Sequence, residues 1–166
     1  MDAPDVYITN QLHGIGTPNI GTSGSRFGTV YATIFNGEAT AAQWGDLAEK
    51  YKTKELYESG TVICVSEDDN YDVEQTSEDL CTSTIGVISA QPGYTMNNQQ
   101  EEGQYVALVG LVPVKIIGKI KKGNFIVPTI SGCARAGKPE ELAYKIGVCN
   151  ESSDRTDVRL VKCIIK

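Results

Sequence analysis

The stretch that decides the fold is residues 20–51, IGTSGSRFGTVYATIFNGEATAAQWGDLAEKY. Within it, residues 27–35 (FGTVYATIF) are rich in β-branched and aromatic side chains and predict a strand. The Asn36-Gly37 dipeptide that follows predicts a turn. The glycine-rich sequence around this strand offers few side chains against which to bury its apolar residues. We therefore expect neighbouring copies of the chain to complete its core, which favours a protein that assembles over one that catalyses.

The second half of the stretch predicts one short α-helix over residues 41–52. Trp44, Leu47, Ala48 and Tyr51 recur at the spacing i, i+3, i+4 and i+7, which is one face of a helix. We expect Trp44, the only tryptophan, to anchor an N-terminal arm to the body of the protein. The apolar residues expected at the assembly interface are Ile20, Phe27, Val30, Tyr31, Ile34, Phe35 and Trp44.

After Gly60 the sequence predicts strands throughout. Apolar, β-branched runs occupy residues 61–66, 83–89, 104–118, 124–130, 144–150 and 157–165. Short strands separated by turn residues, with no second helical period, favour a small antiparallel β-barrel or sandwich. We expect the long run to bend near Gly110 or Pro113, and we expect Pro113 and Pro128 to lie at sheet edges or bulges.

The sequence thus predicts a mainly β protein with an extended N-terminal arm, one short α-helix and then the barrel or sandwich. We expect the glycine-rich assembly arm to cover residues 1–37, a helical joint to cover residues 38–58, and a globular β domain to cover residues 59–166. A length of 166 residues suits one compact domain with an appendage.

The bulk properties exclude several kinds of partner. A net charge of −6 argues against nucleic acid, because phosphate binding needs clustered positive charge. No run of roughly 18 apolar residues occurs, so we expect no membrane span. The start, MDAPDVYITNQ, has neither the basic nor the apolar region of a secretory signal, so we expect no such signal and synthesis in a cytoplasm.

The cysteines suggest structural thiols. They are Cys64, Cys81, Cys133, Cys149 and Cys163. Their number is odd, no CxxC occurs, and the single histidine, His13, cannot complete a zinc site of the usual spacing. We expect all of them to be reduced, with one bridged pair as the alternative. We expect neither a metal nor a cofactor.

The acidic run of residues 67–79 places oxygen-bearing side chains at the ligand offsets of a calcium loop. Val73 stands where the sharp turn of such a loop needs glycine, and Asp79 stands where a bidentate glutamate is expected. We therefore expect a solvated acidic hairpin loop, with calcium binding as the alternative.

Four lysines, Lys115, Lys119, Lys121 and Lys122, form a local basic cluster. Lysines along a strand edge oppose unwanted pairing between sheets, and this is the interpretation we favour. Contact with the acidic run of another copy is the alternative.

No catalytic set is evident. The glycines between residues 14 and 28 do not match a phosphate-binding loop and are interpreted as turn residues. A nucleophilic triad would have to use His13, which lies in the loose arm. Asp46 and Glu49, three apart on the expected helix, could approach each other, but we expect them to be solvated or paired with Lys50 and Lys52.

The stretch of residues 20–51 also resembles a pattern in tail fibres and spikes of tailed phages and in related virion proteins of large DNA viruses. There, a strand of the form IG…RFGTVYA…F.G leads into A..ADLAE.Y, followed by Y.PGTVV. Here Tyr57, Gly60, Thr61 and Val62 continue the pattern, and Ser59 replaces the commoner proline. The blocks GVISAQPGYTMNN, VALVGLVPVKIIGKIKKGNFIVPTISGCA and YKIGVCNES are similar to that family's C-terminal β module, so the resemblance covers about residues 20–165.

The resemblance implies a trimeric, interwoven β arm followed by a globular β domain, in a structural component of a virion made in the host cytoplasm. The short chain favours a minor capsid protein, a capsid decoration or a short fibre over a full receptor-binding fibre. The expected partners are further copies of the chain and other capsid or fibre proteins.

Two rival functions stay open at this point. Related fibres carry autoproteolytic chaperone domains, although no catalytic pair of that kind can be placed on these residues. A carbohydrate-binding β module could instead use Tyr71, Tyr94 and Tyr105 as stacking platforms.

Overall fold

The computed structural model describes residues 24 and 45–166, and residues 45–166 belong to one compact unit. This unit is mainly β, as the sequence predicts. Its strands are β1 (Gly45–Tyr51), β2 (Val62–Val65), β3 (Val73–Gln75), β4 (Thr84–Ile88), β5 (Tyr94–Met96), β6 (Gln104–Ile116), β7 (Phe125–Thr129), β8 (Cys133–Ala136), β9 (Gly147–Cys149) and β10 (Arg159–Ile165). One short 3₁₀-helix, η1 (Pro139–Tyr144), precedes β9.

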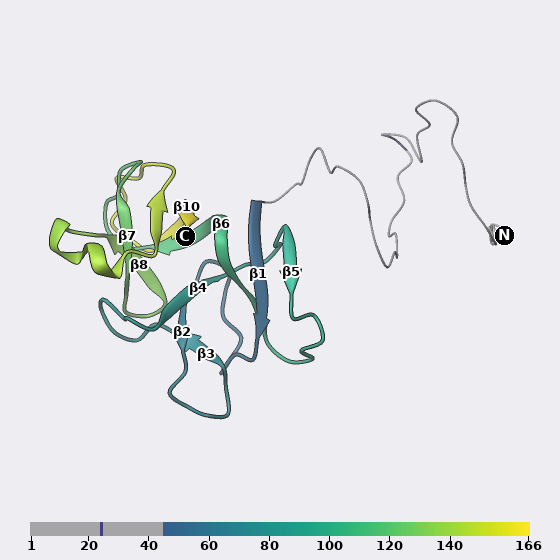
Figure 1. Cartoon of the computed structure of the whole chain (residues 1–166). Coiled ribbons are helices and arrows are strands. Elements are labelled where there is room, and N and C mark those ends of the chain that lie inside the picture. The colour runs from purple at the N-terminus through teal and green to yellow at the C-terminus, as the bar shows by residue number, and fades with distance from the viewer. Residues whose placement is uncertain (1–23, 25–44) are drawn as a thin grey trace. The chain divides into compact units, whose positions relative to one another are not determined.

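Strand β6 is the longest and belongs to two regions of the fold. Its N-terminal half pairs with β1 and β4, and its C-terminal half pairs with β10 and, at Ile116, with β8. Gly110 and Leu111 pair with β1 and with β10 at once, so these two strands flank β6 on opposite sides (Figure 1). The register along this one strand therefore fixes how the two regions meet.

The C-terminal region is a closed five-stranded barrel. Its strands are ordered β10–β9–β7–β8–β6, and β6 pairs back onto β10 to close the ring. A closed ring leaves no unpaired strand edge. Alternate residues point inward along each strand, so Val112, Val114 and Ile116 of β6 meet Val161 and Cys163 of β10 in the core. The predicted barrel is confirmed, although the β6–β8 pair is parallel.

The N-terminal region is an open sheet in the order β5–β1–β6–β4–β2–β3. Its core is smaller than that of the barrel and contains Tyr57, Ile63, Val73, Ile88 and Val106. The sheet ends in the three-residue strands β3 and β5. β5 pairs only with β1, whereas β3 pairs with β2 and also forms one bridge, from Val73 to Thr53 in the segment after β1. Short edge strands limit unwanted pairing with other sheets.

The predicted bend in the long run is confirmed at Gly110. This glycine has φ of +124°, and a Cβ placed on it would lie 2.1 Å from the carbonyl oxygen of Gly45. Only glycine permits both this conformation and this close approach of β1. Pro113 and Pro128 each pair with a strand on one side, opposite Lys162 and Ala134 respectively, so neither interrupts two ladders at once.

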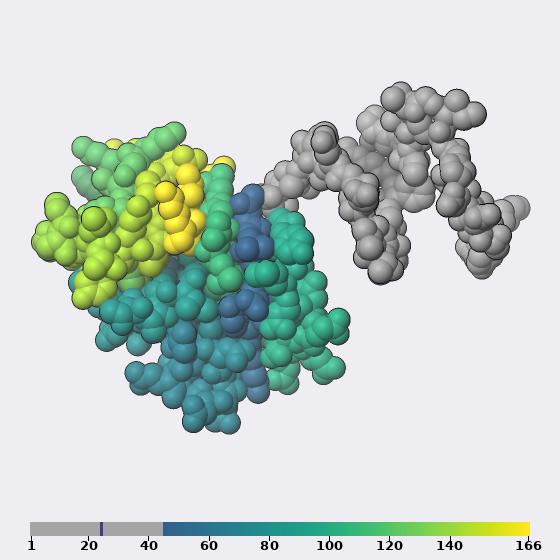
Figure 2. Space-filling view, in the orientation of Figure 1, coloured from purple at the N-terminus to yellow at the C-terminus, as the bar shows by residue number. Residues whose placement is uncertain are grey.

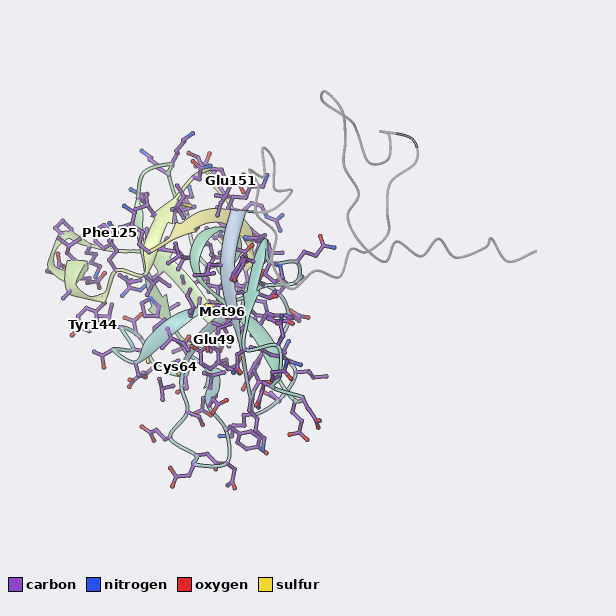
Figure 3. The ribbon with its side chains drawn as sticks, turned by 45° about the vertical axis from the view of Figure 1, so that its right-hand side comes forward. Glu49, Cys64, Met96, Phe125, Tyr144 and Glu151 are labelled. Carbon is purple, nitrogen blue, oxygen red and sulfur yellow. The ribbon has the colours of Figure 1, made fainter. Side chains whose placement is uncertain are left out.

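The predicted helix over residues 41–52 is wrong, because residues 45–51 form the strand β1. The sequence GDLAEKY contains good helix formers, and its apolar spacing fits a helix. Long-range pairing overrides that local preference: β6 runs antiparallel along one side of β1, and β5 runs parallel along the other. Glu49 and Met96, which are register partners, lie next to each other in Figure 3. A helical joint is therefore absent from residues 45–58.

Each of the six predicted runs contains an observed strand. The sequence does not predict the short strands β3, β5 and β8, because three or four residues are too few to establish an alternating pattern. All five cysteines are buried free thiols, which agrees with the predicted reduced state.

Candidate functional site

The arm lies outside the described residues, and so does every predicted interface residue. These are Ile20, Phe27, Val30, Tyr31, Ile34, Phe35 and Trp44. What the structure describes is the surface next to the point where the arm joins the body, at Gly45. The candidate site is built from that surface.

Asp46, the second residue of β1, is the most unusual side chain at this junction. It is only 5% exposed. Ser89 Oγ donates a hydrogen bond to Asp46 Oδ2 at 2.6 Å, and the backbone N–H of Gly93 donates to Oδ1 at 3.0 Å. These bonds attach the start of β1 to the β4–β5 loop. The sequence predicts that Asp46 lies on a helix and is either solvated or paired with Lys50 and Lys52, and this expectation is wrong.

Glu49 is also placed differently from the prediction. Its carboxylate accepts a hydrogen bond from the Tyr51 hydroxyl at 2.8 Å. Burial, followed by this carboxylate, raises the pKa of Tyr51 to about 12. Lys50 donates instead to the carbonyl of Glu101. Because residues three apart on a strand point to opposite faces, Asp46 and Glu49 do not form a carboxylate pair.

Asp46 lines a pocket of about 180 Å³ beside β6. The polar wall comes from Asp46, Ser59, Ser89 and Gln91, and the apolar wall comes from residues 111–113 of β6. A second, more open hollow of about 390 Å³ adjoins it, because Ser59 lines both. Its other walls are Glu58, Lys115, Val158, Arg159 and Leu160. We call the two together the β6 groove.

Apolar side chains surround the β6 groove. Leu111 is 43% exposed, Leu160 is 51% exposed and Val109 is 51% exposed. Ile164 of β10 lies directly opposite Leu111, so the apolar surface continues from one strand to the next. Figure 2 shows β10, β6 and β1 as adjoining yellow, green and blue bands. A contiguous apolar patch of this kind is typical of a protein–protein contact.

The acidic run does not form a calcium loop. Residues 73–75 of the run are strand β3, which separates the two ends of the expected ligand set. Asp79 is instead bound by the Arg135 guanidinium, with Nη2 at 2.7 Å from Oδ2. In the part of the chain that the structure describes, no three His, Cys, Asp or Glu side chains gather as metal ligands.

Arg135 also binds Glu141 on η1, with Nη1 at 2.8 Å from Oε2. The backbone N–H of Lys138 donates to the same carboxylate. The guanidinium and this N–H lower the pKa of Glu141 to about 2. The cluster of Asp79, Arg135 and Glu141 joins η1 and β8 to the loop before β4, and its role is structural.

The predicted basic cluster divides in two. Lys115 pairs with Glu58 at 2.8 Å on the wall of the β6 groove. Lys119, Lys121 and Lys122 lie in the β6–β7 loop, and none of the three forms a salt bridge with another described residue. Whether they contact another copy stays a prediction.

The three tyrosines proposed as a stacking platform do not share one surface. Tyr94 is the register partner of Leu47, and Tyr105 is the partner of Lys50. Leu47 and Lys50 lie on opposite faces of β1, so the two tyrosines also do. Tyr71 lines a separate open cleft together with Tyr51 and Asn97.

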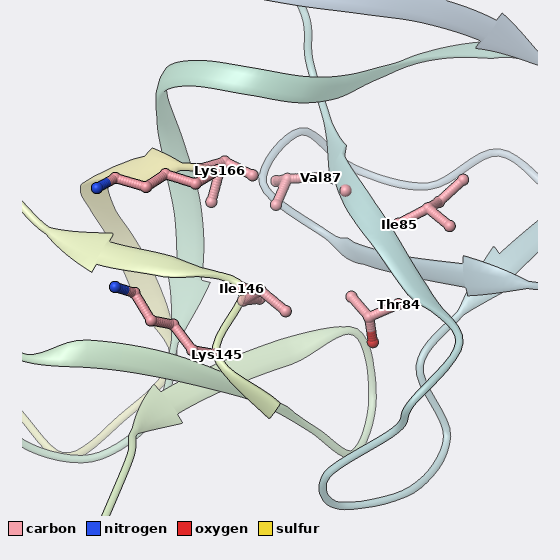
Figure 4. Close-up of a pocket in the computed structure, with 8 residues that line it drawn as sticks. Thr84, Ile85, Val87, Lys145, Ile146 and Lys166 are labelled. Atoms are coloured by element: carbon pink, nitrogen blue, oxygen red, sulfur yellow. The ribbon is translucent and has the colours of Figure 1, made fainter. Parts of the chain in front are cut away.

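A further small pocket, of about 80 Å³, lies between β4 and the end of β10 (Figure 4). Thr84, Val87 and Ile146 line it, and the ammonium groups of Lys145 and Lys166 point away from β4. Its position among packed strands makes it a packing gap between the two regions. No helix among the described residues is both long and apolar enough to cross a membrane.

Sequence reasoning missed the groove because its walls come from five separate segments. Ser59, Ser89 and Leu111 are far apart in the chain and carry no shared motif. The one available signal was Asp46 itself, an acidic residue next to Gly45 and Leu47 in a stretch that contains the family pattern. That signal becomes informative only when β1 is recognised as a strand.

Comparison with known proteins defines the fold first. No family model matches the chain, and no curated protein matches it. Among solved structures, the fold resembles that of a bacteriophage protein. The chain resembles the pre-mature gene product 12 of bacteriophage phi29 with a TM-score of 0.61 and 15% identity, over 79% of this chain and 23% of that chain.

It also resembles the C-terminal fragment of phi29 gene product 12, with a TM-score of 0.56 and 16% identity, over 73% of this chain and 100% of the fragment. The head fiber gp8.5 N base of phi29 aligns less well, with a TM-score of 0.42 and 14% identity, over 72% of this chain and 92% of that chain. The two alignments with gene product 12 confirm the predicted resemblance to phage proteins at the level of the fold.

Proposed function

We propose that this chain is a non-enzymatic structural component of a virion: a minor capsid protein, a capsid decoration or a short fibre component. It assembles as a trimer through its N-terminal arm, residues 1–37, and its further partners are other capsid or fibre proteins. Its place of synthesis is the host cytoplasm.

The observation that carries this proposal is the fold shared with phi29 gene product 12. The sequence pattern of residues 20–51 supports it independently, because that stretch lies mostly outside the described β unit. The apolar surface beside β6 is also what a protein that functions in an assembly needs. In the described part of the chain, the groove holds one buried serine–carboxylate contact and no nucleophile–base–orienting set.

The test is the molar mass in solution of the full chain and of residues 38–166, measured by sedimentation velocity over a range of concentrations. We expect a trimer for the full chain and a monomer for the shortened chain. A full chain that stays monomeric at high concentration contradicts the proposal. Labelling the chain in purified particles would then place it on the capsid or on the tail.

One observation favours a second function, an autoproteolytic chaperone module. The chain covers the whole of a C-terminal fragment, and the longer structure of the same phi29 protein is of its pre-mature form. Such a module would release a fragment of defined mass during purification, and a single Ser, Asp or Asn substitution would abolish the release. An intact mass that is unchanged after long incubation excludes it.

A further inference from the structure

Two of the buried thiols lie side by side in the core of the barrel. Cys149 is the last residue of β9, and Cys163 is its register partner on the antiparallel strand β10. Their Sγ atoms are 3.6 Å apart, which is the contact distance of two sulfurs that are not bonded. The fold therefore brings these two thiols together without any rearrangement of the strands.

The backbone around the pair has the geometry that a disulfide needs. The N–H of Cys149 donates to the carbonyl of Asn124 at 2.8 Å, on the β7 side and away from β10. The next N–H, that of Asn150, donates to the carbonyl of Lys162 on β10 at 2.8 Å. Cys149 and Cys163 thus form a non-hydrogen-bonded pair, in which the Cα atoms are about 4.5 Å apart and the side chains are close. A disulfide joins Cα atoms about 4.4–6.8 Å apart, so the pair falls within its range.

The third cysteine of the barrel shows that burial alone does not place two thiols together. Cys133 of β8 is buried as well, but its register partner is Thr129. Its thiol donates to the carbonyl of Ser131. Cys133 is therefore a matched control for the pair formed by Cys149 and Cys163.

The pair is stable as thiols in the folded chain and becomes reactive when the adjacent loop opens. Burial, followed by the neighbouring sulfur of Cys149, raises the pKa of the Cys163 thiol, so little of the reactive thiolate is present. Cys149 directly precedes the β9–β10 loop, in which residues 154–158 are all exposed. Exposed loops open locally at low free-energy cost, and such an opening admits a small oxidant to the end of β9.

We propose that Cys149 and Cys163 form an intrachain disulfide when the protein enters a medium that contains an oxidising small-molecule disulfide. In the opened state, Cys149 loses its proton and its thiolate attacks one sulfur of the oxidant RSSR, which forms a mixed disulfide and releases one RSH after protonation. The thiolate of Cys163 then attacks Sγ of Cys149 and releases the second RSH. The two cysteines together lose two electrons and two protons, and RSSR is reduced to two molecules of RSH.

The bond would hold the strand that closes the barrel. β10 pairs with β9 on one side and with β6 on the other, so the ring is complete only while β10 stays in place. The two cysteines are 14 positions apart, and a crosslink over a loop of this size stabilises a fold by restricting the unfolded chain. This inference goes beyond the proposed function. For a virion component, release from the host cytoplasm into an oxidising medium is the change that would form the bond.

The experiment maps the crosslink in the full-length chain. One sample is incubated with oxidised glutathione a few degrees below its thermal midpoint, and another is refolded from urea in the same reagent. After free thiols are blocked, trypsin without reductant places Cys149 in the peptide 146–155 and Cys163 in the peptide 163–166, with no other cysteine in either. We expect the two peptides to be joined, and to separate after treatment with dithiothreitol. The thermal midpoint of the oxidised chain should be higher by roughly 10 °C.

Single variants assign the effect to this pair. Cys163→Ala should remove both the joined peptide and the rise in midpoint, whereas Cys133→Ala should keep both. The inference is overturned if the joined peptide appears under neither condition, or if the crosslink uses Cys64, Cys81 or Cys133 instead. The wild-type peptide map decides this even if Cys163→Ala does not fold. Because the map is read within one chain, its failure leaves the proposed assembly untouched, and a monomeric full chain leaves the disulfide site untouched.

Discussion

The barrel and the open sheet share β6 but differ in how the edges of their strands are covered. The barrel closes on itself, and its core contains fully buried side chains from each of its five strands. The open sheet has a smaller core and ends in two short strands, of which β3 is joined by a single bridge to Thr53 in the segment after β1. We therefore expect the barrel to be the more stable of the two regions. The junction beside β1 contains the groove and the exposed apolar side chains around it.

The largest expected effect is in the barrel core. Ile126 of β7 is fully buried, and Ile126→Ala should lower the free energy of unfolding by about 2–5 kcal/mol because it leaves a cavity. Urea denaturation measures this loss. Ile130→Ala is the control, since Ile130 is 55% exposed, and it should change stability by less than about 0.5 kcal/mol. Similar losses in the two variants would mean that the barrel core is not tightly packed.

The next effect concerns the joint between the two regions. Gly110→Ala places a Cβ against the backbone of Gly45 at a positive φ, so β1 must shift away from β6. We expect a loss of about 1–3 kcal/mol from the backbone conformation alone, with further loss from the displaced strand. Gly118 also has a positive φ, but a Cβ placed on it has no neighbour within 4 Å. The stability that Gly118→Ala loses therefore measures the cost of the backbone conformation alone.

Hydrogen exchange is the measurement that separates the two contributions for Gly110→Ala. We expect the amides of β1 to lose protection while those of β7 and β10 keep it, because the damage lies on the side of the open sheet. Uniform loss across both regions would show that sheet and barrel unfold as one unit. That result would remove the distinction drawn between them.

A smaller effect follows from the Arg135 cluster. The pKa of Glu141 lies at about 2 in the folded protein, below its ordinary value of 4.5. Because the folded carboxylate holds its proton less tightly, the stabilisation is complete above about pH 4.5 and is lost as the pH falls towards about 2. Arg135→Leu should make the pH dependence of unfolding shallower in this window.

The control for that prediction is Arg155→Leu. Arg155 pairs with Asp157 in an exposed loop, and exposed pairs contribute little to stability. Its pH profile should therefore follow the wild type closely. If the pH dependence of unfolding became equally shallow in both variants, the Arg135 cluster would contribute no more to stability than a surface ion pair.

The smallest expected effect is at Tyr51, on the last residue of β1. Its pKa of about 12 arises first from burial and then from Glu49. Stability should therefore decrease slightly as the pH rises from 10 to about 12, because the unfolded chain releases this proton first. Glu49→Gln should lower the pKa while leaving it above 10. Difference absorbance against Tyr51→Phe measures this titration.

Much of the barrel could be predicted from sequence, and most of the groove could not. The predicted runs that contain β4, β6, β7 and β10 are rich in β-branched residues, so their own composition is enough to predict strands. Gly110 could be identified as a bend because glycine within an apolar strand usually marks one. The groove depends on Asp46, whose burial follows from loops that meet only in the folded chain.

The segment GDLAEKY shows most clearly where prediction from local sequence fails. The apolar residues within and just before it fit helical spacing, and its composition favours a helix, yet it forms a strand because both β5 and β6 offer partners for its backbone. A local helix preference contributes a few tenths of a kcal/mol per residue, which the hydrogen bonds that β1 forms with β6 along its length and with β5 over residues 47–49 outweigh.

The sequence by itself determined the β class, the positions of the main strands, the bend in β6 and the resemblance to virion proteins. These depend on local composition and on short motifs, which are fully present in the chain. Only the tertiary structure decided that the barrel closes, that β1 is a strand, and that Asp46 lies buried beside an apolar groove. These depend on pairings between distant residues, whose partners become neighbours only when the chain has folded.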